Sequence, residues 1–144
     1  MTGVFEVSTV EETWAVAKSL AAELRPGDVV CLEGDLGAGK TTFTQGLAAA
    51  LGVSGRVTSP TFCIVQEHPP RTAGGAFLVH MDLYRLQGEA DVLAIGWEDY
   101  LSDGAVLVVE WPERAGTLVP ESAHRVRLTH SGDADEKRHI DIRR

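Results

Sequence analysis

Apolar positions along the chain follow two different spacings. Continuous or alternating apolar runs predict strands, whereas apolar positions three or four residues apart predict helices. The predicted strands cover residues 4–7, 29–33, 62–66, 76–82, 105–110, 125–128 and 138–142. The predicted helices cover residues 41–51, 89–95 and 97–101, and a further helix lies between Thr9 and Pro26. Strands and helices therefore alternate through most of the chain.

The first predicted helix carries clear local signals at both ends. Ser8 and Thr9 each precede a glutamate by three residues, which is the capping-box pattern of a helix start. Pro26 and Gly27 predict its end. The apolar face between these points predicts core positions for Trp14, Ala17, Leu20 or Ala21, and Leu24.

The order of these elements predicts an α/β fold. Continuous apolar runs such as 29–33 and 105–110 are typical of buried parallel strands. The last two segments alternate in polarity and are joined through Ser131-Gly132-Asp133, which predicts a β-hairpin. A chain of 144 residues suits one domain. We therefore expect a single domain, residues 1–144, built as a three-layer sandwich around a mixed, mainly parallel sheet with a C-terminal β-hairpin.

A glycine-rich segment between strand 29–33 and helix 41–51 carries the strongest chemical signal. It reads Gly34-Asp35-Leu36-Gly37-Ala38-Gly39-Lys40-Thr41 and fits the phosphate-loop pattern G-x-x-x-x-G-K-[ST]. Its glycines let backbone N–H groups wrap phosphate oxygens above the helix N-terminus. Lys40 can reach the β- and γ-phosphates, and the Thr41 hydroxyl can bind Mg²⁺. The segment predicts a P-loop NTPase-type fold that binds a nucleoside triphosphate.

A phosphate loop of this kind works with an acidic residue at the end of a neighbouring strand, which holds Mg²⁺ directly or through water. Two residues meet this requirement. Glu110 closes the purely apolar run 105–109, and Asp82 closes the run 77–81, which contains His80. The pattern favours Glu110 as the metal carboxylate and keeps Asp82 as the alternative.

A polar loop, Thr58-Ser59-Pro60-Thr61-Phe62, follows the phosphate-loop helix. Loops in this place in P-loop enzymes respond to the γ-phosphate, so a hydroxyl from Thr58, Ser59 or Thr61 is a candidate for orienting the attacking water. An ordinary turn with backbone hydrogen bonds from Ser and Thr explains the same pattern. Both interpretations stay open at this stage.

Charge limits the class of partner. The chain carries 13 Lys plus Arg against 21 Asp plus Glu, for a net charge of −8. Nucleic acids and anionic membranes are held by clustered positive charge, so this chain is not expected to bind either by itself. The tail from His124 to Arg144 is richer in basic than in acidic residues. We hypothesise that this tail contacts the nucleotide or a binding partner.

Three features predict a cytoplasmic protein. No segment approaches the roughly 18 consecutive apolar residues of a membrane helix. Residues 1–6 lack the features of a signal peptide. Cys31 and Cys63 lie in apolar runs without metal-ligand spacing, so we expect small buried thiols in a reducing compartment.

Four motifs follow one another along the chain. They are the phosphate loop extended through Thr42-Phe43, then Ser59-Pro60-Thr61-Phe62, His80-Met81-Asp82-Leu83-Tyr84-Arg85-Leu86 and Val109-Glu110-Trp111-Pro112-Glu113. In order and spacing they resemble the TsaE (YjeE) family, the small bacterial P-loop ATPases of tRNA threonylcarbamoyladenosine (t6A) synthesis. The resemblance covers the chain from about Ser8 into the terminal hairpin.

This resemblance implies Mg²⁺-dependent hydrolysis of ATP to ADP and phosphate, slow without partners. It implies TsaD and TsaB as protein partners, which transfer the threonylcarbamoyl group to adenosine in tRNA. The role implied for this chain is to support turnover of the TsaB–TsaD complex. It would meet tRNA only indirectly through that complex, and neither DNA nor a membrane is an expected partner.

The same resemblance implies a role for each matching residue. The residues expected to act on the phosphate chain and its metal are Lys40 for phosphate, Thr41 and Glu110 for Mg²⁺, Asp82 for hydrolysis and Thr61 in a switch loop. Those expected to contact the nucleotide elsewhere are Thr42, Thr13 near the adenine, and Trp111 near the nucleotide or a partner.

Three other functions use a phosphate loop. A small-molecule kinase, which donates the γ-phosphate to an acceptor, is the alternative that we keep, although Arg71 stands alone in its loop where a kinase has an arginine-bearing lid. A GTPase requires an N-K-x-D motif, and this sequence has none. A module that binds nucleotide without hydrolysing it is disfavoured by the two carboxylates at strand ends.

Several other residues have both a functional and a structural interpretation. His80 is either a ligand or a packed, hydrogen-bonded strand residue. Tyr84 and Arg85 either bind a partner or phosphate, or form a core tyrosine beside a solvated arginine. Trp14 and Trp97 lie on apolar faces and are predicted to be in the core.

Overall fold

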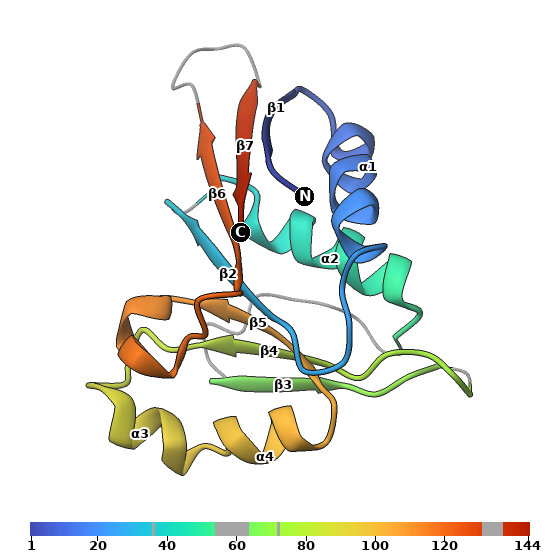
Figure 1. The fold of residues 1–144 in the computed structure, drawn as a ribbon. Helices are drawn as coiled ribbons and strands as arrows, with labels where there is room; N and C mark the ends of the chain where they lie inside the picture. Colours follow the sequence, from blue (N-terminus) through green and yellow to red (C-terminus); the bar gives the residue numbers. More distant parts are fainter. Residues whose placement is uncertain (36, 54–63, 72, 131–136) are drawn as a thin grey trace.

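Seven strands form one mixed sheet in the computed structural model, which describes residues 1–35, 37–53, 64–71, 73–130 and 137–144. The strands are β1 (Gly3–Val7), β2 (Val29–Gly34), β3 (Val65–His68), β4 (Leu78–Asp82), β5 (Val106–Glu110), β6 (His124–His130) and β7 (Arg138–Arg143). Their order across the sheet is β1-β7-β6-β2-β5-β4-β3 (Figure 1). Strands β6, β2, β5 and β4 run parallel, whereas β7 is antiparallel to β6 and β1, and β3 is antiparallel to β4. The mixed sheet with a C-terminal hairpin is therefore confirmed.

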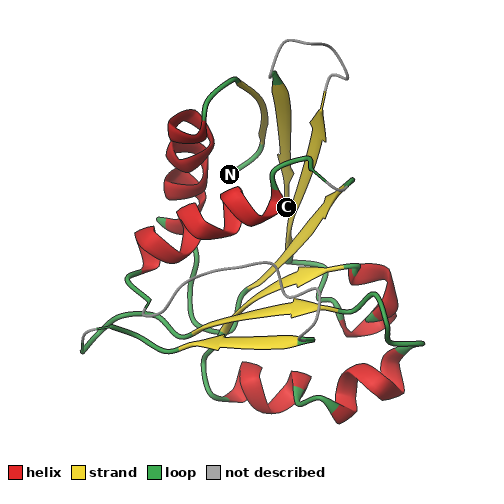
Figure 2. Cartoon of the chain, turned by 180° about the vertical axis from the view of Figure 1, so that it is seen from behind, coloured by secondary structure: helices red, strands yellow, loops and turns green. Residues whose placement is uncertain are grey.

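Helices cover both faces of this sheet (Figure 2). Helices α1 (Val10–Ala21) and α2 (Lys40–Leu51) pack on one face, and α3 (Glu89–Ala94) and α4 (Trp97–Ser102) pack on the other. Successive side chains of a strand point to opposite faces. In β2, Val30 and Leu32 thus join the core under α1 and α2, while Val29 and Cys31 join the core under α3 and α4. This division produces the predicted three-layer sandwich.

Helix α1 begins where the sequence predicts and ends earlier. Thr9 is its N-cap, and the Thr9 hydroxyl accepts a hydrogen bond from the backbone N–H of Glu12 at 3.1 Å. Such a cap satisfies a donor that the first turn leaves without a partner. The helix stops at Ala21, ahead of the predicted stop at Pro26.

The two tryptophans that were predicted to be in the core differ. Trp97 is 1% exposed, as expected, but Trp14 is 43% exposed, so that prediction is wrong. Trp14 lies at the seam between α1 and α2, where its Nε1–H donates to the carbonyl oxygen of Thr42 at 3.2 Å. An indole N–H needs a polar partner, and at this seam it finds one without full burial of the ring.

Other predicted boundaries hold to within a few residues. Gly96, with φ 102°, separates α3 from α4, and Gly52, with φ 71°, ends α2. Strand β3 begins at Val65, later than the predicted strand 62–66, whose first two residues lie outside the described part of the chain. The hairpin pairs β6 with β7, and its predicted turn at residues 131–133 lies outside the described residues. Within the described ranges, no helix has both the length and the apolar character needed to cross a membrane.

The register of the parallel strands places three C-terminal strand ends together. Glu110 at the end of β5 stands opposite Leu32 of β2 on one side and Asp82 of β4 on the other. The phosphate loop leaves β2 at this same edge. Ligands of open α/β sheets bind at such an edge, so the fold itself points to the site.

Candidate functional site

The phosphate loop joins β2 to α2, and two of its glycines are required by the backbone. Gly34 has φ 154° and Gly39 has φ 104°, angles that residues with side chains rarely adopt. A Cβ on Gly34 would also lie 2.6 Å from the carbonyl oxygen of Leu128 in β6. Glycine therefore serves both the turn and the close approach of the hairpin to the loop.

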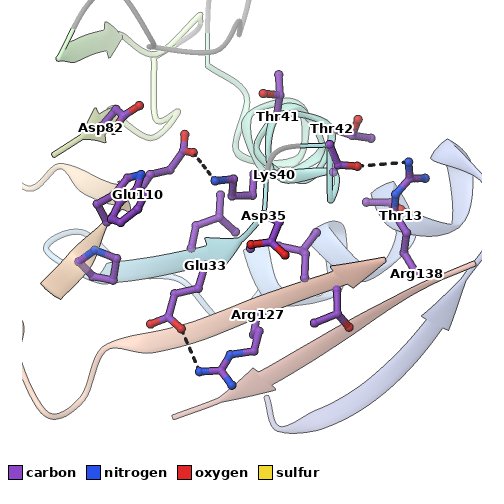
Figure 3. Close-up of a pocket in the computed structure, with 18 of the residues that line it drawn as sticks. Thr13, Glu33, Asp35, Lys40, Thr41, Thr42, Asp82, Glu110, Arg127 and Arg138 are labelled. Carbon is purple, nitrogen blue, oxygen red and sulfur yellow. Dashed lines mark hydrogen bonds and ion pairs between the residues drawn. The ribbon is translucent and has the colours of Figure 1, made fainter. Parts of the chain in front are cut away.

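The loop borders a pocket of about 1140 Å³ (Figure 3). The predicted site residues that line it are Thr13, Gly34, Asp35, Gly37, Gly39, Lys40, Thr41, Thr42, Asp82, Glu110 and Trp111. Ala38, also in the loop, is buried and is not among the residues that line the pocket. Leu36 and Thr61, with the rest of the predicted switch loop Ser59-Pro60-Thr61, lie outside the described residues. The fold thus gathers into one pocket residues that are far apart in the sequence.

Glu110 lies at the end of the pocket that also holds Lys40 and Asp82, which we call the charged end. Its carboxylate contacts Lys40 and His80. Its Oε1 lies 3.3 Å from Lys40 Nζ, and its Oε2 lies 2.8 Å from His80 Nε2. Burial raises the pKa of Glu110, but hydrogen bonds and charge interactions with His80 and Lys40 outweigh this effect and leave the pKa below its ordinary value. Glu110 is therefore a carboxylate at neutral pH and can face both a lysine and a metal ion.

The sequence pattern did not identify His80 as the partner of Glu110. His80 is fully buried, and its Nε2 is the donor because a carboxylate only accepts. The structural interpretation, a packed and hydrogen-bonded strand residue, is right. A signal was present: alternation along β4 places His80 and Asp82 on the same face of that strand.

Asp82 lies on the pocket wall beside Glu110. It is half-buried, and its Oδ1 accepts a hydrogen bond from the backbone N–H of Tyr84 at 3.0 Å. Glu110 contacts Lys40 directly, in keeping with the preference for Glu110 as metal carboxylate, but the choice between the two acids stays a prediction.

An aromatic cluster stands at the rim of the pocket, next to these acids. Trp111 has φ 58° and ψ 53°, the sole positive φ outside glycine in the part of the chain that the structure describes. Its ring centroid lies 4.8 Å from that of Tyr84 and 6.0 Å from Arg114 Cζ. Tyr84 is 56% exposed, so the interpretation of Tyr84 as a core residue is wrong. Strained backbone of this kind clusters at functional sites, and here it places an indole at the pocket rim.

The opposite side of the phosphate loop is lined by α1 and the C-terminal hairpin. Thr13 of α1 is buried and borders the pocket, and its place near the adenine stays a prediction. Arg138 of β7 lies beside it in Figure 3, and Arg138 Nη2 is 3.5 Å from the carbonyl oxygen of Gly37. Arg127 of β6 pairs with Glu33 at 3.2 Å. The basic tail therefore borders this pocket, and its contact with nucleotide, partner or tRNA stays a hypothesis.

Known proteins share both the sequence and the fold of this chain. The family model described as threonylcarbamoyl adenosine biosynthesis protein TsaE matches residues 7–140. The tRNA threonylcarbamoyladenosine biosynthesis protein TsaE of Streptomyces coelicolor is 47% identical over 130 residues, which cover 88% of this chain and 86% of that protein. The protein of the same name from Bacillus subtilis is 44% identical over 127 residues, which cover 88% of this chain and 77% of that protein.

A solved structure agrees with these sequence matches. The crystal structure of Bacillus subtilis YdiB superposes with a TM-score of 0.77 at 35% sequence identity, and the match covers 99% of this chain and 84% of that chain. The resemblance that the four motifs carry is thus confirmed over most of the sequence, and the chain belongs to the TsaE family of threonylcarbamoyl adenosine biosynthesis proteins.

Proposed function

We propose that this chain is a Mg²⁺-dependent ATPase that supports t6A synthesis on tRNA. The observation that carries the proposal is the 3.3 Å pair between Lys40 of the phosphate loop and Glu110 at the end of β5, on the wall of one pocket. In P-loop NTPases a lysine at this position binds phosphate and a carboxylate on the adjacent strand holds the metal. A triphosphate bound here would pair with Lys40 and leave the Glu110 carboxylate to hold Mg²⁺.

The residues of the pocket supply what hydrolysis requires. Backbone N–H groups of the loop and Lys40 hold the phosphate chain. Water attacks the γ-phosphorus, the bond to the β–γ bridging oxygen breaks, and ADP and inorganic phosphate are released. We assign Asp82 to orient this water and accept its proton, because the Tyr84 N–H fixes one oxygen and leaves the other for the water. We also retain the proposal that Thr61 belongs to a switch loop that responds to the γ-phosphate.

The oxygen donors at this end of the pocket suit Mg²⁺. Magnesium is usually held by one or two carboxylates together with substrate phosphates and water, not by an all-protein cage. Thr41 and Glu110 offer a hydroxyl and a carboxylate on the wall of the same pocket. Among the described residues, no group of three or more His, Cys, Asp or Glu could form such a cage. When bound, Mg²⁺ would neutralise charge on the phosphates.

We assign TsaD and TsaB as the protein partners, in the cytoplasm, with tRNA reached through them. Membership of a t6A biosynthesis family supports this assignment. The net charge of −8 supports an indirect contact with tRNA, because a phosphate backbone repels an acidic surface. The same charge argues against DNA or an anionic membrane as a partner.

The experiment that tests this proposal is reconstitution of t6A synthesis. The purified chain would be mixed with TsaB, TsaD, the threonylcarbamoyl donor, ATP and unmodified tRNA under multiple-turnover conditions. We expect product yield to fall to about one equivalent of the complex when the chain is omitted or replaced by Lys40→Ala, because phosphate binding is lost. The matched control is Lys18→Ala, because Lys18 is exposed on α1 and does not line the pocket. Unchanged yield without the chain would refute the proposal.

A small-molecule kinase is the alternative, and an assay of inorganic phosphate release addresses it. An ATPase releases phosphate to water, whereas a kinase needs an acceptor. We expect slow release of inorganic phosphate by the wild-type chain alone, stimulated by TsaB and TsaD, and abolished in Lys40→Ala. Formation of ADP and a phosphorylated acceptor, without inorganic phosphate and only after a small-molecule acceptor is added, would favour the kinase.

A further inference from the structure

Among the residues that the structure describes, three Lys and Arg side chains line the pocket, and two of them are paired with a carboxylate. Lys40 pairs with Glu110 at 3.3 Å, and Arg127 pairs with Glu33 at 3.2 Å. Arg138 of β7 makes no ion pair with any carboxylate in the described ranges of the chain. A half-buried cation without a counter-ion beside a phosphate loop points to an anionic ligand.

The hydrogen bonds of Arg138 are also incomplete. Its Nη2 lies 3.5 Å from the carbonyl oxygen of Gly37, at the outer limit for a hydrogen bond. Its Nε is buried and has no hydrogen-bond partner among the residues described. The side chain lies against the loop, since a Cβ on Gly39 would stand 3.5 Å from Arg138 Cδ. Buried donors are normally satisfied, so a further acceptor is expected here.

The position of Arg138 indicates which part of a nucleotide supplies that acceptor. Arg138 lies against Gly37 and Gly39, and Figure 3 shows it on the side of the phosphate loop away from Glu110 and Asp82. The proposed γ-phosphate and Mg²⁺ lie at the carboxylates, so the phosphate chain runs from there toward Arg138.

We propose that Arg138 binds the nucleotide on the α-phosphate side of its phosphate chain. The inference rests on the proposed function and adds a residue from the last strand to the binding site. A guanidinium offers several N–H donors in a fixed plane and matches phosphate oxygens well. The C-terminal hairpin is then a direct ligand-binding element as well as part of the sheet.

The test measures binding of ADP to the full chain by calorimetry. Arg138→Gln keeps an N–H donor for the Gly37 carbonyl and removes the charge, whereas Arg138→Lys keeps the charge. Arg143→Gln is the matched control, because Arg143 lies on the same strand and pairs with Asp141 outside the pocket. We expect Kd to rise about 10- to 100-fold in Arg138→Gln, as for loss of a charged hydrogen bond, and to recover in part in Arg138→Lys.

The outcomes distinguish a failure of this inference from a failure of the proposed ATPase function. Wild-type affinity in Arg138→Gln, or equal loss in Arg138→Gln and Arg143→Gln, would overturn the role of Arg138 and leave the ATPase proposal standing. Equal loss in Arg138→Lys and Arg138→Gln would overturn a charge-based contact. No binding of ADP to the wild-type chain would overturn both proposals. Thermal unfolding of each variant guards against misfolding, and Arg138→Met, which keeps the aliphatic stem, replaces Arg138→Gln if that variant is unstable.

Discussion

At the scale of single residues, one buried carboxylate organises the charged end of the pocket. Each oxygen of Glu110 has its own partner, Lys40 on one side and His80 on the other. Lys40 can exchange this partner for a phosphate, whereas His80 is fully buried within β4 and stays in place. His80 therefore fixes the orientation of the carboxylate while Lys40 is free to act on a ligand.

Replacing His80 tests this division of roles. We expect His80→Leu to raise the Mg²⁺ concentration for half-maximal ATP hydrolysis about 10- to 100-fold, because a residue that orients a metal ligand typically contributes this much. His80→Gln, which keeps a donor, should retain more of the wild-type Mg²⁺ dependence. ADP affinity in excess EDTA is the control and should not change. Wild-type Mg²⁺ dependence in His80→Leu would contradict the role.

The sequence predicted the residues of the site better than their contacts. Lys40, Thr41 and Glu110 belong to motifs whose chemistry fixes the residue type, so the sequence could nominate them; the structure brings them to one pocket, and their roles stay predictions. The contact of His80 with Glu110 was not found, because it depends on the register between β4 and β5, which a single sequence does not specify. Trp14 was misplaced because periodicity indicates a face but not how deeply a large side chain is covered there. For Tyr84, of the two interpretations kept open, only the core one is wrong.

At the scale of elements, the packing of α1 on α2 holds the start of the phosphate-loop helix against the sheet. Gly46 in α2 allows the two helices to approach closely. A Cβ at Gly46 would lie 2.9 Å from both Ala17 Cβ and Trp14 Cδ1. Ala17 is fully buried and its Cβ is attached directly to the backbone, so it cannot move aside without shifting a helix.

A larger side chain at this seam should destabilise the protein. We expect Gly46→Val to lower the free energy of unfolding by about 2 kcal/mol, within the usual range for overpacking a core. Urea unfolding followed by circular dichroism measures the change. Gly88→Val is the control: a Cβ there meets nothing within 4 Å, and the backbone is extended. Equal stability of the two variants would argue against tight helix contact.

The elements themselves were largely predictable. Strands β2 and β5 are continuous apolar runs, and α1 and α2 have explicit start or stop residues, so their types and approximate bounds followed from local chemistry. Strand β3 was displaced because it is a short edge strand with polar residues, and pairing with β4 decides its bounds.

At the scale of the whole molecule, the two cores are closed to solvent. Cys31 in β2 is fully buried in the core under α3 and α4. Burial raises the pKa of its thiol to about 11. The reactive thiolate is therefore almost absent at pH 8, and reagents reach the sulfur only when the core opens.

Alkylation of Cys31 should consequently report opening of the fold. In a Cys63→Ser background, we expect iodoacetamide at pH 8 to react with the native protein at least about 100-fold more slowly than with the urea-unfolded chain, because thiolate is scarce and access is blocked. Mass spectrometry measures the rate, and a variant with both cysteines replaced by serine gives the background. Rapid reaction of the native protein would contradict a closed core.

The sheet order also sets the sequence of events during synthesis. β1 is made first, yet its sheet partner is β7, the last strand to be made, with Gly3 opposite Ile142. This pairing closes the long loop between β1 and β7, and the loss of conformational entropy on closing so long a loop makes the pairing slow to form. A growing polypeptide can assemble the central parallel strands early, but β1 has no partner until β7 leaves the ribosome, and the phosphate loop gains Arg138 only then. Closure of the sheet and completion of the pocket are thus one late event.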